Sequence, residues 1–349
     1  MLILENVPLA PMTTLGVGGP ARYFFEAHSE QQVRDALIFA RERDLQLFVM
    51  GGGSNLLVSD SGFAGLVLKI GLLGITQRSL GRDVVRFDVA AGEHWDAFVA
   101  GTVQSRCAGL ECLSGIPGTV GGTPVQNVGA YGQEVRDTIC EVRALHVATL
   151  ESVAMTNEDC KFGYRSSRFN TVDRGEYVIT RASFSQLHGG KPKLAYGDLK
   201  SHFANHPGEP TLRETREAVL EVRRRKAMVI EPGNADSRSV GSFFKNPVIA
   251  EQQYGHLAEQ LSGRGWQMPS YPAGEGLRKV PAAWLLEHAG FHKGYAKGAV
   301  GISSRHTLAL VNRGGARAAE IVALKDEIQA RIRDEFGIEL QPEPVFVGF

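Results

Sequence analysis

The sequence predicts an α+β protein with two or three domains. A capped amphipathic helix and the apolar run after it favour a small α/β unit at the N-terminus. Beyond Gly71 the pattern changes to β-rich runs between glycine-rich turns, and helical patterns return in the last third of the chain. Because one domain usually holds about 100 to 200 residues, a chain of 349 residues divides into several. We expect limits at 1–70, 71–227 and 228–336, followed by a terminal segment, 337–349.

The N-terminal unit contains one helix and two strand candidates. Ser29 and Gln32 form a capping box, and apolar residues then repeat on one helical face at Val33, Ala36, Leu37 and Ala40. The run at 45–50 is a strand candidate, and a second apolar run at 66–70 ends the unit. We therefore expect a helix packed on a small sheet.

The second region is predicted to be mainly sheet. Its strand candidates are 84–90, 142–149 and 177–185, and an amphipathic helix is expected at 95–103. The segment 188–210 is rich in Gly, Pro, His and Lys, so we expect a loop whose length favours a lid. Thr211 then begins a helix, and Glu214 completes its capping box.

The last third is predicted to hold two helices. Pro281 and Gly290 mark the ends of a short helix. A longer helix ends at Gly337, and its buried face is expected to carry Ile321, Leu324, Lys325, Ile328 and Ile332. The final run, 338–349, is strand-like but is interrupted by two prolines.

Composition excludes several classes of protein. Lys and Arg together number 38, as do Asp and Glu, so no net field favours nucleic acid or anionic lipid. Glu5 lies where a signal peptide would be basic, and no apolar run approaches the roughly 20 residues of a membrane span. We therefore expect a cytoplasmic protein. The four cysteines form no Cys-x-x-Cys pair, which disfavours a disulfide framework or a metal site and favours small core cysteines.

Three glycine-rich segments differ in what they predict. The segment 16–21 has the spacing of a dinucleotide fingerprint, but Pro20 interrupts the expected helix and too few residues precede it to form a strand. Gly51-Gly-Gly-Ser-Asn55 follows a predicted strand, so its amides can turn toward a pyrophosphate, although a plain flexible turn is the alternative. The segment 115–132 interleaves glycines with apolar residues, which favours a loop held against a core and close to a flat ligand.

Taken in order, the motifs resemble those of the UDP-N-acetylenolpyruvoylglucosamine reductases, flavoenzymes that make UDP-N-acetylmuramate for peptidoglycan. The resemblance covers nearly the whole chain. The motifs that carry it are Thr14-Leu-Gly-Val-Gly-Gly19, Gly51-Gly-Gly-Ser-Asn55, the segment 115–132, Lys161-Phe-Gly-Tyr-Arg-Ser166 and Gly241-Ser-Phe-Phe-Lys-Asn-Pro247.

The resemblance implies a three-domain α+β flavoprotein. Its FAD-binding domain would have two parts, of the vanillyl-alcohol-oxidase or PCMH type, with an α+β substrate-binding domain and a terminal segment that returns to the FAD-binding domain. No histidine lies between His28 and His94, where some related oxidases attach FAD, so we expect noncovalent FAD. The implied cofactor-binding residues are Gly51, Gly52, Gly53, Ser54, Asn55, Ile116, Gly118, Gly121, Gly122, Asn127, Gly129 and Ala130.

The family's reaction gives three residues a catalytic role. Hydride addition to an enol ether builds negative charge on the neighbouring carboxylate, which a fixed cation stabilises. Arg165 matches that cation, and Ser242 matches the family's proton donor. Glu343 matches an acidic residue of the same centre, although Pro344 and Val345 replace the apolar and basic residues expected after it. Without the resemblance these residues would be a surface ion-pair arginine, a turn serine and an exposed glutamate.

The substrate's nucleotide end is assigned in the same way. Lys226 matches a phosphate-binding lysine, although the charge run 223–226 alone would be a solvated helix face. Tyr196 matches the aromatic residue of a mobile loop, and Tyr164 and Asn246 match further substrate-binding residues. NADPH is implied as the electron source, with ping-pong kinetics, and we expect a monomer.

Two alternatives remain open. The chain could be another flavin oxidoreductase on the same scaffold, such as an oxidase of a small alcohol, which would react rapidly with oxygen and ignore UDP-sugars. It could also be a nucleotide-sugar-binding protein that has lost catalysis, and such a protein would lack the yellow colour of flavin.

Overall fold

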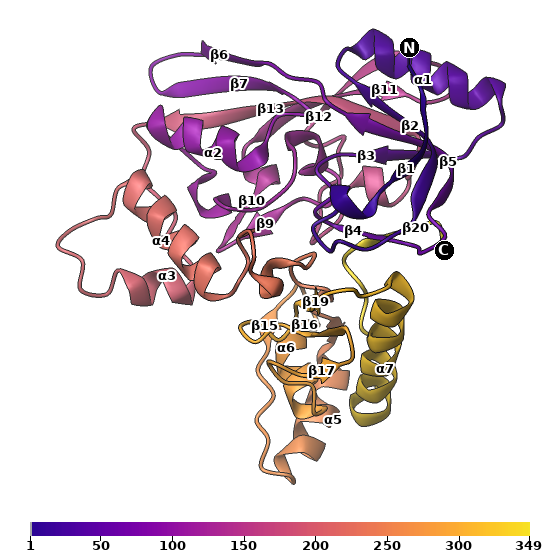
Figure 1. Ribbon diagram of the computed structural model, residues 1–349. Helices are drawn as coiled ribbons and strands as arrows, with labels where there is room; N and C mark the ends of the chain where they lie inside the picture. Colours follow the sequence, from indigo (N-terminus) through magenta and orange to yellow (C-terminus); the bar gives the residue numbers. More distant parts are fainter. Residues whose placement is uncertain (1) are drawn as a thin grey trace.

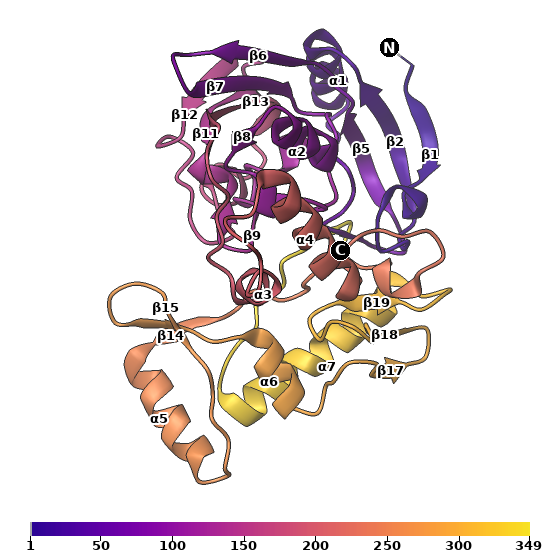
Figure 2. The ribbon, with the colours of Figure 1, turned by 90° about the vertical axis from the view of Figure 1, so that its left-hand side faces the viewer.

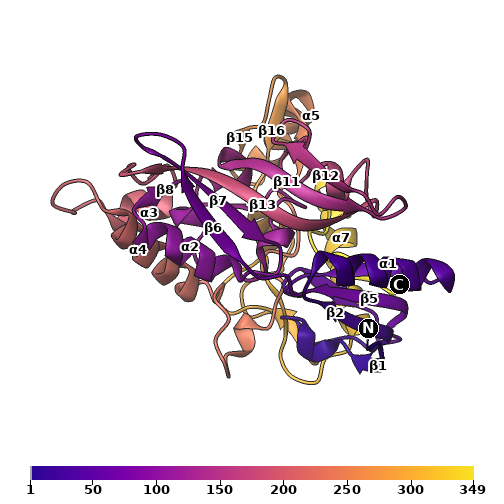
Figure 3. The same ribbon diagram turned by 90° about the horizontal axis from the view of Figure 1, so that it is seen from above.

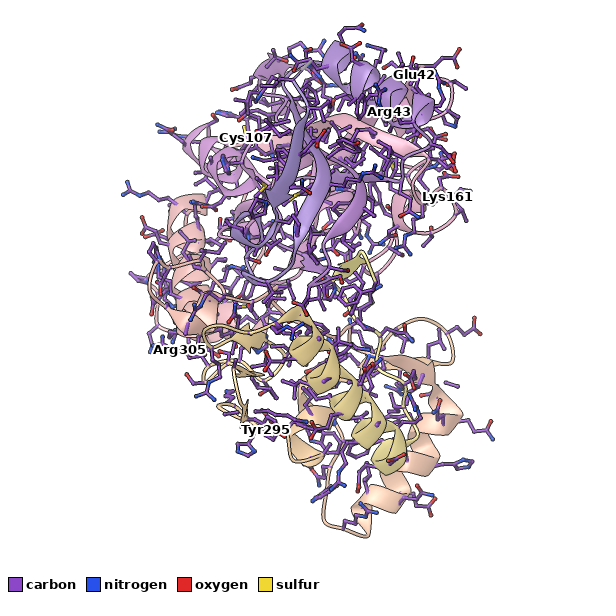
Figure 4. All side chains as sticks on the ribbon, turned by 45° about the vertical axis from the view of Figure 1, so that its right-hand side comes forward. Glu42, Arg43, Cys107, Lys161, Tyr295 and Arg305 are labelled. Carbon is purple, nitrogen blue, oxygen red and sulfur yellow. The ribbon has the colours of Figure 1, made fainter. Side chains whose placement is uncertain are left out.

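The computed structural model describes residues 2–349, and the chain folds into an upper part built on two larger sheets and a lower part of helices and short strands (Figure 1). Figure 4 shows side chains filling both parts, with Cys107 and Lys161 in the upper one and Tyr295 in the lower one. Cys107, Cys112 and Cys160 are buried. Among residues 2–349, no helix combines the length and the apolar character needed to cross a membrane.

The first sheet is built around the predicted N-terminal helix. Ser29 caps α1 (Glu30–Glu42) as expected, because its hydroxyl accepts a hydrogen bond from the Gln32 amide at 3.2 Å. The predicted strands appear as β3 (Leu47–Met50) and β5 (Phe63–Ile70). Strands β1 (Leu4–Pro8) and β2 (Pro20–Ala27) were not predicted. The order is β1-β2-β5-β3, in which β1 is antiparallel to β2 and the other pairs are parallel.

The second sheet is antiparallel and lies beside the first (Figure 3). Its order is β12-β11-β13-β7-β6, with β6 (Ile75–Ser79), β7 (Val84–Ala90), β11 (Ile139–His146), β12 (Ser152–Thr156) and β13 (Tyr177–His188). The strand predicted at 142–149 ends three residues early, because the chain turns at Leu150, whose φ is 62°. The short strand β8 (Cys107–Ala108) pairs with the end of β13, and β9 (Gly129–Ala130) and β10 (Gln133–Glu134) form a separate two-stranded sheet.

One hydrophobic core joins the two sheets. It contains Leu66 of β5, Phe184 of β13 and Trp95 of the predicted helix, which forms α2 (Trp95–Gln104). Leu66, Phe184 and Trp95 are fully buried, and removing a buried leucine or phenylalanine typically costs about 2 to 5 kcal/mol. The sheets therefore hold each other in a fixed orientation, and with them the glycine-rich loops at their edges.

The predicted lid is not entirely a loop. Residues 197–202 form a short helix, α3 (Gly197–His202), which packs on α4 (Leu212–Arg225) through Leu199. The Gly, Pro, His and Lys residues of the segment favoured a loop, so the helix was not predicted. It depends on burial of Leu199 rather than on local helix propensity. The capping box of α4 is confirmed, since the Thr211 hydroxyl accepts from the Glu214 amide and the Glu214 carboxylate accepts from the Thr211 amide.

The lower part packs three helices against short strands (Figure 2). The predicted helices are α6 (Ala282–His288) and α7 (Ala318–Phe336), and Gly337 ends α7 with a φ of 64°. Helix α5 (Glu251–Ser262) was not predicted. The strands are β14 (Val248–Ala250), β15 (Tyr271–Pro272), β16 (Leu277–Lys279), β17 (Ala296–Lys297), β18 (Val300–Ile302) and β19 (Leu310–Asn312).

The end of the chain returns to the upper part. Of the strand-like run 338–349, only β20 (Val345–Val347) forms a strand, and it pairs in parallel with β4 (Leu56–Val58). Strand β4 directly follows the Gly51 to Asn55 turn. The pairing therefore brings Glu343 to that turn, from which it is separated by nearly the whole sequence.

Candidate functional site

A cavity of about 1220 Å³ lies where the upper and lower parts meet. Glycine-rich turns of the upper part line one side, and segments of the lower part and the chain end line the other. Of the residues predicted from the sequence, it is lined by Gly51, Gly52, Gly53, Ser54, Asn55, Ile116, Gly118, Gly121, Gly122, Gly129, Ala130, Tyr164, Arg165, Tyr196, Lys226, Ser242, Asn246 and Glu343. The structure thus gathers nearly all of them around one space.

The two glycine-rich turns touch each other backbone to backbone. A Cβ atom on Gly52 would lie 2.7 Å from the Gly118 Cα atom, and one on Gly53 would lie 1.9 Å from the Met12 carbonyl oxygen. The Ser54 hydroxyl donates to the Pro117 carbonyl at 2.9 Å and holds the turns together. At these positions glycine is needed for packing within the protein, quite apart from any ligand.

Gly122 differs from these glycines. A Cβ atom built on Gly122 meets no protein atom within 4 Å, although the residue lines the cavity. Its neighbour Gly121 has its Cα against Ala91, where a Cβ atom would approach to 2.6 Å. The loop therefore presents open backbone at Gly122, where a large flat group can approach.

Asn127 does not line the cavity. It is fully buried, with a φ of 46°, and its amide nitrogen donates to the Glu134 carboxylate and to the Gly163 carbonyl at 2.8 and 2.9 Å. Its side-chain oxygen accepts from the Arg136 amide. These bonds fix the loop behind the cavity wall, so the residue acts in this structure as a scaffold for its neighbours.

Arg165 and Glu343 form an ion pair at the cavity. The Arg165 Nε atom lies 3.0 Å from Glu343 Oε1, and Nη2 donates to the Gly129 carbonyl at 2.9 Å. Arg165 has a φ of 51°, a conformation that costs a non-glycine residue of the order of 1 kcal/mol or more. A tight turn imposes it, in which the Gly163 amide donates to the Ser166 carbonyl. The guanidinium is thereby held at the loop that carries Gly129.

Backbone pairing places Glu343 beside the serine segment. The Glu343 amide donates to the Phe243 carbonyl at 2.8 Å, and the Asn55 amide side chain donates to the Glu343 carbonyl at 3.2 Å. Burial raises the pKa of the Glu343 carboxyl group, and the cations Arg165 and Lys245 only partly oppose this. Glu343 is therefore better able to hold a proton than an exposed glutamate.

Ser242 has a partner that the sequence did not indicate. Its hydroxyl oxygen lies 3.3 Å from Nε2 of His306, which also lines the cavity. His306 belongs to the turn between β18 and β19 and is part of no motif that we recognised. No local signal would have found it, because the contact joins residues 64 positions apart.

Asp198, in helix α3, was also not identified from the sequence. Its carboxylate pairs with the Lys226 ammonium group at 2.5 Å. Burial alone would lower the pKa of Lys226, but the hydrogen bond that its ammonium group donates to Asp198 raises the pKa above its usual value. Tyr196 of the same segment packs edge-on against Tyr131, with ring centroids 5.4 Å apart. The lysine predicted to bind phosphate is thus paired with a carboxylate of the loop predicted to be mobile.

The side-chain oxygen of Asn246 accepts a hydrogen bond within the protein. Its side-chain oxygen accepts from the Ala282 amide at 2.9 Å, at the start of α6, and its backbone amide lies 3.4 Å from the Tyr164 hydroxyl. The Lys279 ammonium group lies 5.1 Å from the centroid of the Tyr164 ring. The Asn246 side-chain nitrogen remains the group that can donate into the cavity.

The cavity favours an anionic ligand. Its lining brings together cationic side chains from both parts of the protein: Arg165, Arg223, Lys226, Lys245 and Lys279. Arg223 is buried, and its Nε atom has no hydrogen-bond partner. Among residues 2–349 no group of three or more His, Cys, Asp or Glu side chains is placed to hold a metal ion. The site can therefore hold phosphate and carboxylate groups by cations and backbone amides.

The fold and the glycine-rich turns define a class of flavin-binding proteins. The family described as "FAD binding domain" matches residues 21–149, which include both turns. A second family, described as "UDP-N-acetylenolpyruvoylglucosamine reductase, C-terminal domain", matches residues 232–347.

Full-length relatives identify the family. The UDP-N-acetylenolpyruvoylglucosamine reductase of Streptomyces avermitilis is 44% identical over 99% of this chain and 95% of its own length. That of Thermobifida fusca is 42% identical over 99% and 98%. The crystal structure of the enzyme of that name from Thermus caldophilus superposes with a TM-score of 0.65, at 25% identity, over 99% of this chain and all of that one. The chain belongs to the UDP-N-acetylenolpyruvoylglucosamine reductase family, and the predicted family and the fold class of a multi-domain α+β flavoprotein are confirmed.

Proposed function

We propose that this chain reduces UDP-N-acetylenolpyruvoylglucosamine to UDP-N-acetylmuramate, with FAD as cofactor and NADPH as reductant, in peptidoglycan precursor synthesis. The observation that carries the proposal is that both glycine-rich turns and the residues Arg165, Ser242 and Glu343 line one cavity. Full-length similarity to reductases of this name supports the same conclusion.

The residues of the upper part suit FAD. Open backbone at Gly122 and the touching turns at Gly52 and Gly118 form the cradle that a dinucleotide's pyrophosphate and ring need. Gly51, Ser54, Asn55, Ile116, Gly129 and Ala130 complete the wall that would hold the cofactor, and Asn127 would act from behind it. When bound, FAD supplies the hydride that it has received from NADPH.

Arg165 holds the carboxylate of the enolpyruvyl group in this proposal. The reaction develops negative charge on that carboxylate, and a fixed guanidinium stabilises the charge more in the transition state than in the ground state. Ser242 donates the proton to the carbon beside the carboxylate. Glu343, whose pKa burial raises, shares a proton with this centre or orients a water molecule.

The nucleotide end of the substrate binds toward the loop that carries Tyr196. Lys226 contacts the diphosphate, and Tyr196 closes over the nucleotide. Asn246 donates its side-chain N–H to the substrate, while Tyr164 lines the same wall. The cationic lining of the cavity supports this orientation.

We also propose the domain limits 1–70, 71–227 and 228–336, with 337–349 returning to the FAD-binding part. The pairing of β20 with β4 supports this last assignment. We propose that the protein acts as a monomer, because the proposed catalytic and substrate-binding residues of a single chain all line the one cavity, and that it works in the cytoplasm.

A two-step absorbance experiment tests the function. NADPH should bleach the bound flavin, and the enolpyruvyl nucleotide added after it should restore the yellow colour without oxygen. Rapid reoxidation by oxygen together with indifference to the nucleotide would identify another flavin oxidoreductase. Protein purified without flavin, and unable to take it up, would indicate a nucleotide-sugar-binding protein without catalysis.

A further inference from the structure

The turn that carries His306 is fixed to the serine segment by backbone bonds. The Phe243 amide donates to the Leu308 carbonyl at 2.7 Å, directly beside Ser242. Within the turn the Ala309 amide donates to the His306 carbonyl, and the neighbouring Thr307 hydroxyl donates to the Glu287 carboxylate at 2.6 Å. The 3.3 Å separation of His306 Nε2 and Ser242 Oγ is therefore set by two anchored segments.

His306 is neutral near pH 7. Burial lowers its pKa to about 4, and the cations that face it act in the same direction: Lys226, Lys293 and Arg223. A neutral imidazole carries one hydrogen, on either Nε2 or Nδ1. The chemistry of Ser242 depends on which nitrogen carries it.

The two tautomers direct the serine hydrogen differently. With hydrogen on Nδ1, Nε2 is an acceptor, and the Ser242 hydroxyl would point its hydrogen at His306. With hydrogen on Nε2, the imidazole donates to the serine oxygen, and the hydroxyl hydrogen is free to point into the cavity. Only the second arrangement suits a serine that gives its proton to a substrate.

We propose that His306 is a positioning residue for Ser242, and that its Nε2–H donates to the serine oxygen, so that the hydroxyl hydrogen is directed into the cavity. The inference rests on the proposed role of Ser242 as proton donor. It adds a residue that helps the serine act as an acid.

The proton transfer balances without a proton from His306. The Ser242 O–H bond breaks, a C–H bond forms on the carbon beside the carboxylate, and the electron pair stays on the serine oxygen. The Nε2–H bond to this alkoxide is strongest when the negative charge has formed, so it lowers the barrier. A proton from solvent then restores the hydroxyl group.

Two variants separate hydrogen bonding from packing. His306→Leu removes the donor, and we expect reoxidation of the reduced flavin by the enolpyruvyl nucleotide to slow about 10- to 100-fold, which is less than the roughly 10²- to 10³-fold for loss of a donor to a reacting oxyanion, because His306 acts through Ser242. His306→Gln keeps an N–H donor and should stay within about 5-fold of the parent. Both should be reduced by NADPH at the parent rate and should bind the nucleotide with unchanged affinity, measured from the change in flavin absorbance. His292→Leu, at an exposed histidine of the same part, is the matched control.

The tautomer is measured directly in the holoenzyme by NMR of ¹⁵N-labelled histidine. His306, assigned by the signal that His306→Gln removes, should show a protonated Nε2 and an unprotonated Nδ1 at pH 7. Ser242→Ala should shift its Nε2 signal. A protonated Nδ1, or a His306→Leu variant that is reoxidised at the parent rate, would overturn the inference. Failure of the parent holoenzyme to be reoxidised by the nucleotide would instead count against the proposed function.

Discussion

The ammonium group of Lys226 lies 2.5 Å from a carboxylate oxygen of Asp198. The first residue ends α4, and the second lies in α3, within the segment that also carries Tyr196. A diphosphate and this carboxylate would compete for the same cation. In the proposed binding mode, the diphosphate would displace the Asp198 carboxylate from Lys226.

Neutralising Asp198 should tighten nucleotide binding. In Asp198→Asn the diphosphate no longer competes with a charged carboxylate, and a partly exposed ion pair of this kind is worth up to about 1 kcal/mol. We expect the dissociation constant of the enolpyruvyl nucleotide to fall about 2- to 5-fold, measured by flavin absorbance. Asp44→Asn, at an exposed position, should change nothing. Weaker binding by Asp198→Asn would show that the carboxylate supports the substrate instead.

Removing the Ser242 hydroxyl should separate the two half-reactions. Ser242→Ala keeps the cavity and the flavin environment, so NADPH should reduce it at the parent rate. Without the proton donor, reoxidation by the nucleotide should slow about 10²- to 10⁴-fold, the usual contribution of a general acid. Stopped-flow absorbance measures both steps. Reoxidation at the parent rate would mean that another group is the acid.

Replacing Arg165 by lysine should not preserve activity. The planar guanidinium forms an ion pair with Glu343 and donates a hydrogen bond to the Gly129 carbonyl, and an ammonium group cannot reproduce this planar arrangement. We expect Arg165→Lys to slow nucleotide-dependent reoxidation about 10²-fold or more. Arg168→Lys is the matched control, because Arg168 pairs with Asp173 and is not among the residues lining the cavity. Equal losses in both variants would argue for a structural effect.

Adding one methyl group to the loop tests where the flavin binds. Gly122→Ala meets no protein atom within 4 Å, so the fold should tolerate it, yet the methyl group enters the cavity. We expect a lower content of bound FAD, while the stability of the FAD-free protein stays unchanged. Gly101→Ala, which also has open space but lies in α2, should retain full FAD content. Full FAD content in Gly122→Ala would place the cofactor elsewhere in the cavity.

Acid should weaken the second sheet through Asp88. Burial would raise the pKa of this carboxyl group, but hydrogen bonds from Ser183, Arg86 and Arg78 lower it to about 2. Because the folded pKa is below the unfolded one, the stabilisation is present above pH 4 and is lost as the pH falls toward 2. We expect Asp88→Asn to lower the free energy of unfolding by about 1 to 2 kcal/mol at pH 6 and by less at pH 3. Urea unfolding at both values measures this, with Asp83→Asn as control, and a difference independent of pH would contradict the argument.

Features set by neighbouring residues were predicted well. The cap of α1 by Ser29, the capping box of Thr211 and the end of α7 at Gly337 depend on residues within one helical turn. The unpredicted helices α3 and α5 lack such strong local signals and depend on packing against neighbours. Strand β11 was predicted three residues too far along the chain, because the turn at Leu150 has no glycine to mark it.

The sequence by itself determined the family, the fold class and the residue types that suit a flavin and an anionic substrate, because glycines, capping residues and an ordered set of motifs act through the local backbone. Only the tertiary structure decided which groups meet: Ser242 with His306, Lys226 with Asp198, and Asn127 with the Gly163 carbonyl behind the cavity wall. These contacts join distant segments, so their geometry depends on how two sheets and the returning chain end pack together. Pairing across such distances leaves no periodic signal in the residues themselves.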